Sequence, residues 1–96
     1  MRRDEALAIL AAHREELRQR GVRSLALFGS VARDEAGPAS DVDLLVELER
    51  PAGYFKLAEV KDYLEAILGC KVDLVTRGGI KRQLRQRILA EAIDAA

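Results

Sequence analysis

The sequence predicts a layered α/β domain whose elements follow the order αβαβαβα. Three stretches repeat apolar residues at helical spacing and are expected to be helices: residues 4–19, 54–68 and 80–93. Three shorter stretches are compact apolar runs or alternate apolar with polar residues, which is typical of strands: residues 25–28, 41–48 and 71–76. Alternation of the two kinds of element along the chain favours helices packed on a sheet.

The first half of the chain places a glycine directly after a buried strand. The first helix is expected to end at Gly21, because glycine commonly terminates helices. The strand 25–28 is uniformly apolar and runs directly into Gly29-Ser30. A short helix over 31–33 is expected next, with Ser30 near its N-terminus. Residues 34–40 are polar, contain Gly and Pro, and predict a loop.

The second half places acidic residues on strands. Residues 41–48 alternate, so that one face carries Val42, Leu44, Val46 and Leu48 and the other Asp41, Asp43, Leu45 and Glu47. The helix 54–68 has an apolar inner stripe and is expected to end at Gly69. In the strand 71–76, Asp73 faces away from its neighbours Val72 and Leu74. A turn at Gly78-Gly79 precedes the last helix.

Size and charge limit the classes of protein that this chain can represent. Its 96 residues predict one domain, 1–96, with one modest core. The 16 basic and 16 acidic residues balance, which argues against general nucleic-acid binding as a function, because such binders carry an excess of cations. No apolar run reaches membrane-spanning length, and the single Cys70 cannot form an internal disulfide. We therefore expect a cytoplasmic protein.

Three aspartates form the candidate catalytic and metal site. Asp41 and Asp43 stand two residues apart on one strand, so both carboxylates project from the same face. Asp73 adds a third acid from another strand, where an apolar setting makes a solitary charge costly unless it is solvated, paired or bound to metal. Carboxylates held close together repel until a cation neutralises them. Oxygen-only ligands favour Mg²⁺, with Mn²⁺ as the other candidate.

Gly29 and Ser30 are the candidate phosphate-binding residues. A glycine at the end of a buried strand lets the backbone approach a ligand, and amide groups at a helix start can bind phosphate oxygens. Arg33 is either a phosphate ligand or a salt-bridged surface side chain. Ser40 is expected to be a turn residue that hydrogen-bonds beside the site. Each of these features is common by itself, and it is their combination with the acids that points to a nucleotide site.

The combined pattern resembles a known family. Residues 27–33, Leu-Phe-Gly-Ser-Val-Ala-Arg, precede residues 40–46, Ser-Asp-Val-Asp-Leu-Leu-Val, and residues 68–75 end in Val-Asp-Leu-Val. This arrangement is similar to the minimal nucleotidyltransferase (MNT) family of the polymerase-β-like superfamily. The resemblance implies a small mixed sheet flanked by helices. It also implies that Asp41 and Asp43 hold metal ions, that Gly29-Ser30 hold the triphosphate, and that Asp73 assists a metal or the incoming hydroxyl.

The resemblance further implies an activity and a partner. Stand-alone MNT proteins are typically encoded beside a HEPN-domain ribonuclease toxin and act as its antitoxin, and some members transfer AMP from ATP to a tyrosine of that toxin. We therefore expect Mg-dependent transfer of AMP to a partner protein, within a hetero- or homo-oligomer. A nucleotidyltransferase that acts on RNA or on a small molecule is disfavoured by the short, neutral chain.

One position departs from the family pattern. Asp34 follows the Arg of the first motif, where the family often has Gly, and an acid near a triphosphate site can weaken nucleotide binding. This keeps a second interpretation open, in which the chain is a binding module that neutralises its partner by contact. On the last helix, Lys81, Arg82, Arg85 and Arg87 form a basic run that is interpreted as a solvated face, with partner or nucleic-acid contact as the other reading.

Overall fold

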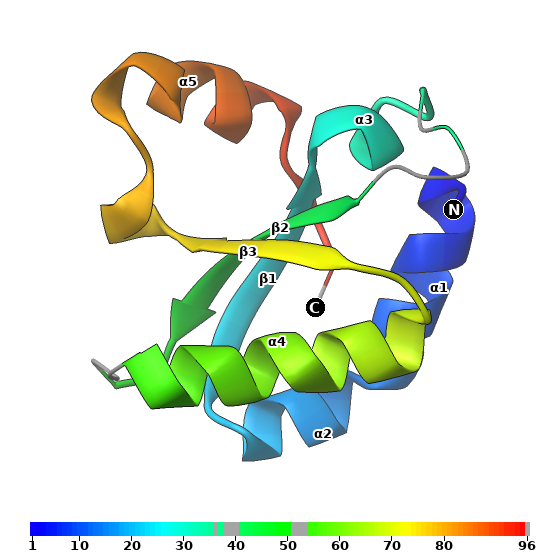
Figure 1. The fold of residues 1–96 in the computed structure, drawn as a ribbon, viewed down its shortest axis with the longest axis vertical. Helices are drawn as coiled ribbons and strands as arrows, with labels where there is room; N and C mark the ends of the chain where they lie inside the picture. Colours follow the sequence, from blue (N-terminus) through cyan, green and yellow to red (C-terminus); the bar gives the residue numbers. More distant parts are fainter. Residues whose placement is uncertain (36, 38–40, 51–53, 96) are drawn as a thin grey trace.

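A computed structural model describes residues 1–35, 37, 41–50 and 54–95 of the chain (Figure 1). The helices are α1 (Arg3–Ala12), α2 (Arg14–Gln19), α3 (Gly29–Ala32), α4 (Tyr54–Leu68), the 3₁₀ helix η1 (Arg77–Gly79) and α5 (Arg82–Glu91). The strands are β1 (Val22–Phe28), β2 (Val42–Leu48), β3 (Val72–Thr76) and β4 (Ile93–Asp94). No helix among the described residues combines the length and apolar character needed to cross a bilayer.

The four strands form one mixed sheet in the order β3-β2-β1-β4. β1 is antiparallel to β2 and to β4, whereas β2 and β3 are parallel. Since α4 connects β2 to β3, the parallel pair has the helical crossover that such strands require. The mixed sheet flanked by helices that the family resemblance implied is confirmed.

One face of the sheet, the core face, packs against α1, α2 and α4. In-register residues Leu27 and Leu44 lie on this face and are fully buried. They share a cluster with Leu10 of α1 and with Val60 and Leu64 of α4. Figure 1 shows α2 and α4 together on one side of the sheet, away from α5. This cluster supplies the main hydrophobic driving force of the fold.

The opposite face, which we call the site face, carries the predicted acids. Strand alternation places Asp43 and Leu45 of β2 on it, in register with Asp73 and Val75 of β3. Phe28 of β1 pairs with Asp43 and lies on the same face. On this side α5 is the neighbouring helix (Figure 1), and none of its residues is buried.

Two elements differ from the sequence prediction. The helix expected over 4–19 is divided at His13, whose backbone N–H bonds the carbonyl of Leu10 while its ring Nδ1 bonds that of Ile9 at 2.8 Å. The imidazole ring thereby occupies the Ile9 carbonyl, which in an uninterrupted helix would accept the backbone N–H of His13. The helix expected over 80–93 ends at Glu91, and Ile93–Asp94 form β4 instead. β4 satisfies backbone groups along the edge of β1 that would otherwise stay unpaired.

Candidate functional site

Asp43 and Asp73 lie side by side at the edge of the sheet. They are register partners on the parallel strands β2 and β3, which places their side chains on the same face of adjacent strands. Asp43 is half-buried and Asp73 is exposed. Asp41 immediately precedes β2 and is exposed. The structure therefore brings together acids that are 30 residues apart in the sequence.

The charge at this edge is not neutralised by the protein. Burial raises the pKa of Asp43 above its ordinary value, and the nearby carboxylates of Asp73 and Asp41 raise that pKa further. The positive charge of Arg33 lowers the same pKa, but the shift remains upward. An arrangement of like charges that costs free energy in the folded state is typical of a site that binds a cation.

Gly29 packs its backbone against Asp43. Its φ of +77° lies in the left-handed region, which favours glycine. A Cβ at this position would lie only 3.0 Å from Cγ of Asp43 and would overlap its carboxylate oxygen Oδ2. The Gly29-Ser30 segment at the start of α3 is thereby held against the acidic edge, and both residues are only half-buried. The predicted phosphate-binding residues and the predicted metal-binding residues are neighbours.

Asp34 closes α3 from a position that usually needs glycine. Its φ is +59°, and the amides of Asp34 and Glu35 bond the carbonyls of Val31 and Ser30 at 3.0 and 2.8 Å. These two bonds are those of a Schellman motif. The Asp34 carboxylate accepts a bond of 3.2 Å from the first amide of α1, that of Arg3. The acid thus has a structural role at the start of another helix.

Arg33 is salt-bridged in this structure. Its Nε lies 3.0 Å from a carboxylate oxygen of Glu35, and its Nη1 lies 2.9 Å from one of Glu91 at the end of α5. The hydrogen bond with Glu35 raises the pKa of Arg33, and the charges of Glu91 and Glu35 add to that shift. Of the two readings of Arg33, the salt-bridged one is present here, beside Asp43.

The acids fit a hard divalent cation by their chemistry. Oxygen ligands and an excess of negative charge are what Mg²⁺ and Mn²⁺ require. Among the described residues, no three acid, His or Cys side chains already converge into a metal-binding group. Ser40 lies outside the described residues. The metal-binding roles of Asp41, Asp43 and Asp73 and the nucleotide-binding roles of Gly29, Ser30, Arg33 and Ser40 stay predictions.

Sequence reasoning missed an apolar hollow that begins at Asp73. It has a volume of about 280 Å³ and lies between the site face and α5. The apolar residues of the last helix recur at helical spacing, but no residue of α5 is buried. The apolar residues around the hollow are Phe28, Val75, Ile80, Leu84 and Ile88.

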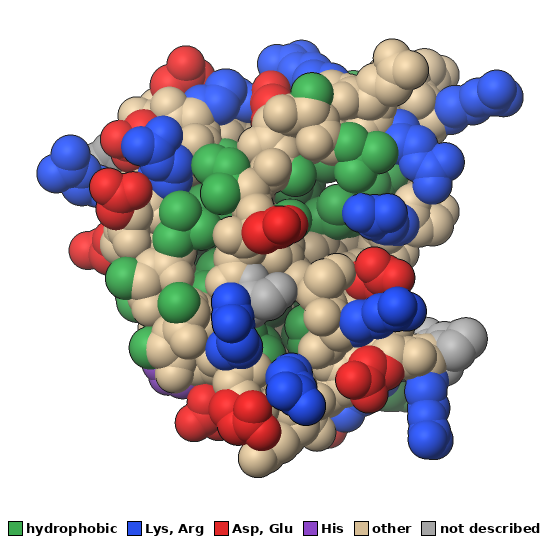
Figure 2. Space-filling view, turned by 180° about the vertical axis from the view of Figure 1, so that it is seen from behind, with side chains coloured by type: hydrophobic (Ala, Val, Ile, Leu, Met, Phe, Trp, Pro, Cys, Tyr) green, Lys and Arg blue, Asp and Glu red, His purple; other side chains and the backbone are tan. Residues whose placement is uncertain are grey.

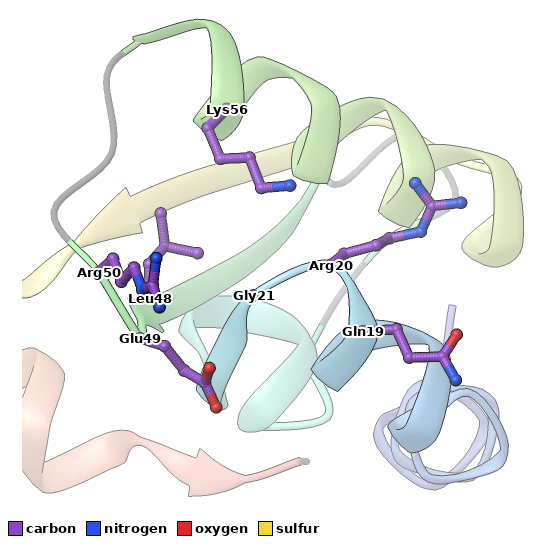
Figure 3. A pocket seen from close by; sticks show the side chains of 7 residues that line it. All are labelled: Gln19, Arg20, Gly21, Leu48, Glu49, Arg50 and Lys56. Atoms are coloured by element: carbon purple, nitrogen blue, oxygen red, sulfur yellow. The ribbon is translucent and has the colours of Figure 1, made fainter.

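A second hollow of about 280 Å³ lies at the other end of the sheet (Figure 3). It is formed where β1 begins and β2 ends, whereas Asp43 stands near the start of β2. Lys56 reaches from α4 toward Gly21, and the Glu49 carboxylate points away from both (Figure 3). Neither Asp43 nor Asp73 lines this hollow, so it is separate from the acidic site.

Comparisons with known proteins agree with this fold. The family model described as nucleotidyltransferase domain matches residues 10–95. The protein adenylyltransferase MntA of Thermococcus cleftensis is 44% identical over 91 residues, covering 94% of this chain and 92% of that protein. A solved structure described as a candidate minimal nucleotidyltransferase has a TM-score of 0.82 at 38% identity, covering 97% of this chain and 95% of the other.

A more distant likeness concerns the fold alone. It is the structure of a tri-AMPylated Shewanella oneidensis HEPN toxin in complex with an MNT antitoxin, at 19% identity and a TM-score of 0.69. That match covers 95% of this chain and 71% of the other. The family match spans nearly the whole chain, and the Thermococcus relative shares close to half of its residues. The chain therefore belongs to the nucleotidyltransferase domain family and is a nucleotidyltransferase.

Proposed function

We propose that this chain transfers AMP from Mg–ATP to a hydroxyl of a HEPN-domain toxin and acts as the antitoxin of that protein. The observation that supports this best is the pairing of Asp43 with Asp73 beside the backbone of Gly29. Metal-binding acids and a phosphate-binding segment are the two parts that nucleotidyl transfer requires. The name of the Thermococcus relative, protein adenylyltransferase, supports AMP as the transferred group.

Asp41, Asp43 and Asp73 are the residues that would hold the divalent cations. Their carboxylates offer only oxygen ligands, and the raised pKa of Asp43 reflects negative charge that a cation would offset. A bound cation would neutralise charge on the phosphates and acidify the attacking hydroxyl.

The residues of the chain position the reactants. The amides of Gly29 and Ser30 bind phosphate oxygens, and Asp73 lies exposed beside Asp43, where it accepts the proton of the incoming hydroxyl. The hydroxyl oxygen forms a bond to the α-phosphorus, and the bond from that phosphorus to the bridging oxygen of the β-phosphate breaks. Pyrophosphate leaves with the electron pair of that bond. Positioning and electrostatics account for most of the catalysis.

The HEPN partner follows from the motif resemblance. The Shewanella complex, in which a HEPN toxin is AMPylated and bound by an MNT antitoxin, is in keeping with this partner. The other function consistent with the fold is neutralisation of the partner by contact. Asp34 kept this interpretation open, but the Asp34 carboxylate accepts a bond from the amide of Arg3 in α1.

The test is to incubate the chain with Mg–ATP and a HEPN protein encoded beside it. We expect a mass gain of one or more adenylates on the partner. The variant Asp41→Asn/Asp43→Asn should abolish that gain, whereas the exposed Asp62→Asn on α4 is the control and should leave it unchanged. Neutralisation of the toxin that persists in the double variant without any adenylate would support the contact mechanism and contradict transfer.

A further inference from the structure

The helix α5 is exposed except at Ile88 and Glu91, which are part-buried. None of its ten residues is buried, and Leu84 and Leu89 are 46% and 42% exposed. A helix this short has little stability of its own in water. Its last residue, Glu91, forms an ion pair with Arg33. An exposed helix that presents large apolar side chains is a candidate contact surface.

The apolar part of this surface reaches Asp73, one of the three candidate catalytic acids. Leu84 and Ile88 of α5 line the 280 Å³ hollow together with Phe28, and Asp73 forms part of the same wall. Figure 2 shows apolar side chains gathered around a hollowed area on the upper half of this face, bordered by Lys and Arg. A partner polypeptide that places an apolar side chain in the hollow would bring its neighbouring residues close to Asp73.

The charged part of the surface is strongly positive. Residues 77–91 contain one acid, Glu91, while the chain as a whole is neutral. The stretch carries five cations, Arg77, Lys81, Arg82, Arg85 and Arg87. Among the described residues, Arg87 is the one of these five that forms an ion pair, with Glu91. Such a concentration of unpaired cations beside an apolar hollow favours an acidic polypeptide as the occupant.

We propose that α5 and the hollow beneath it dock an acidic segment of the acceptor protein that contains an apolar residue, and thereby deliver the acceptor hydroxyl to Asp73. This inference rests on the proposed function for the identity of the acceptor. A second copy of the chain does not suit the surface, because α5 against α5 would place cations on cations. RNA would match the charge but not the apolar hollow.

The test reverses charge on α5 and measures transfer to the HEPN partner. The variant Arg82→Glu/Arg85→Glu changes two exposed side chains, and Arg14→Glu/Lys61→Glu is the control with the same change in net charge on α2 and α4. We expect the α5 variant to raise KM for the partner about tenfold, with kcat at saturating partner retained. The rise in melting temperature caused by Mg–ATP should equal that of the unmodified chain. Poly-L-glutamate should inhibit transfer by the unmodified chain more strongly than by the α5 variant.

Two results would overturn the proposal: an unchanged KM for the partner, or loss of the stabilisation by Mg–ATP in the α5 variant. If KM is unchanged and the α5 variant also loses RNA binding in a gel-shift assay, the surface binds RNA instead. If the unmodified chain transfers no AMP, the proposed activity is wrong. The docking proposal is then tested by measuring the affinity of the chain for the partner directly. In that case the affinity for the partner must fall about tenfold in the α5 variant but not in the control. If the unmodified chain does not bind the partner, the docking proposal is wrong.

Discussion

Gly29 illustrates how a single residue couples the backbone to the site. Replacement by Ala would force a side chain into the left-handed region and onto the Asp43 carboxylate. We expect Gly29→Ala to destabilise the domain by about 1–3 kcal/mol and to abolish AMP transfer. Thermal unfolding and the transfer assay measure the two effects. Gly78→Ala is the control, because a Cβ there meets no atom within 4 Å; equal losses in both variants would contradict this account.

Asp34 has two structural roles that can be separated by substitution. Ala would lose the bond to the amide of Arg3 and would also be strained at a φ of +59°. We expect Asp34→Ala to lower the free energy of unfolding by about 1–2 kcal/mol. Asp34→Gly should lose less, because it relieves the strain, and Asp34→Asn should lose least. Denaturant unfolding measures the free energy of unfolding of the three variants. A sharp rise of AMP transfer in Asp34→Gly would show instead that the Asp34 carboxylate obstructs nucleotide binding.

At the scale of elements, α4 is bonded to the start of β3 by one side chain. Oε2 of Glu65 accepts a hydrogen bond of 2.9 Å from the amide of Val72, the residue before Asp73. Glu65→Ala would leave this part-buried amide without its partner and should cost about 1–2 kcal/mol of stability. Glu65→Gln retains an acceptor and should recover most of that loss. Thermal unfolding compares the two, and equal melting temperatures would show that the bond contributes little.

The two halves of the first helix show how local chemistry decides an element boundary. His13 combines its bond to Ile9 with an edge-to-face contact to Tyr63, the ring centroids being 6.3 Å apart. Arg20, at the end of α2, stacks its guanidinium 4.0 Å from the centroid of the same ring. Hydrophobic periodicity alone continues through His13, so the break was not predictable from spacing.

At the scale of the whole molecule, burial of Asp43 and its repulsion by Asp73 and Asp41 oppose folding of the metal-free protein. The pKa of Asp43 is higher in the folded state than in the unfolded chain, so the folded state binds its proton more tightly. Stability therefore falls as pH rises from the ordinary Asp pKa through the raised value, and the penalty is complete above that raised value. We expect Asp43→Asn to raise the melting temperature of the metal-free protein by about 2–4 °C and to flatten this pH dependence.

Added Mg²⁺ should give the unmodified chain a higher melting temperature than Asp43→Asn, the reverse of the order without metal. A ligand that binds only the folded state stabilises it in proportion to the logarithm of its concentration. Mg²⁺ with ATP should therefore raise the melting temperature of the unmodified chain more than that of Asp43→Asn. Scanning calorimetry with and without Mg²⁺ provides the comparison, with Asp62→Asn as the control. Equal responses of all three proteins would argue against a metal role for Asp43.

The sequence predicted much of the architecture because its patterns are local. Helix α4 has the predicted bounds, since a continuous apolar stripe is ended by Gly69 at a φ of +72°. The parity of β2 and β3 placed Asp43 and Asp73 away from the core face, as observed. The strand β4 was missed, because two residues have no detectable pattern and pair only where β1 offers a free edge.

By itself, the sequence determined the fold class, the family and which acids are candidates for the site, because strand alternation and short motifs are encoded within a few residues. Only the tertiary structure decided the rest. It set Asp43 beside Asp73, assigned the Asp34 carboxylate to α1, paired Arg33 with Glu91, and left α5 exposed over an apolar hollow. Each of these depends on contacts between segments that are distant along the chain, and no local pattern specifies which such segments meet.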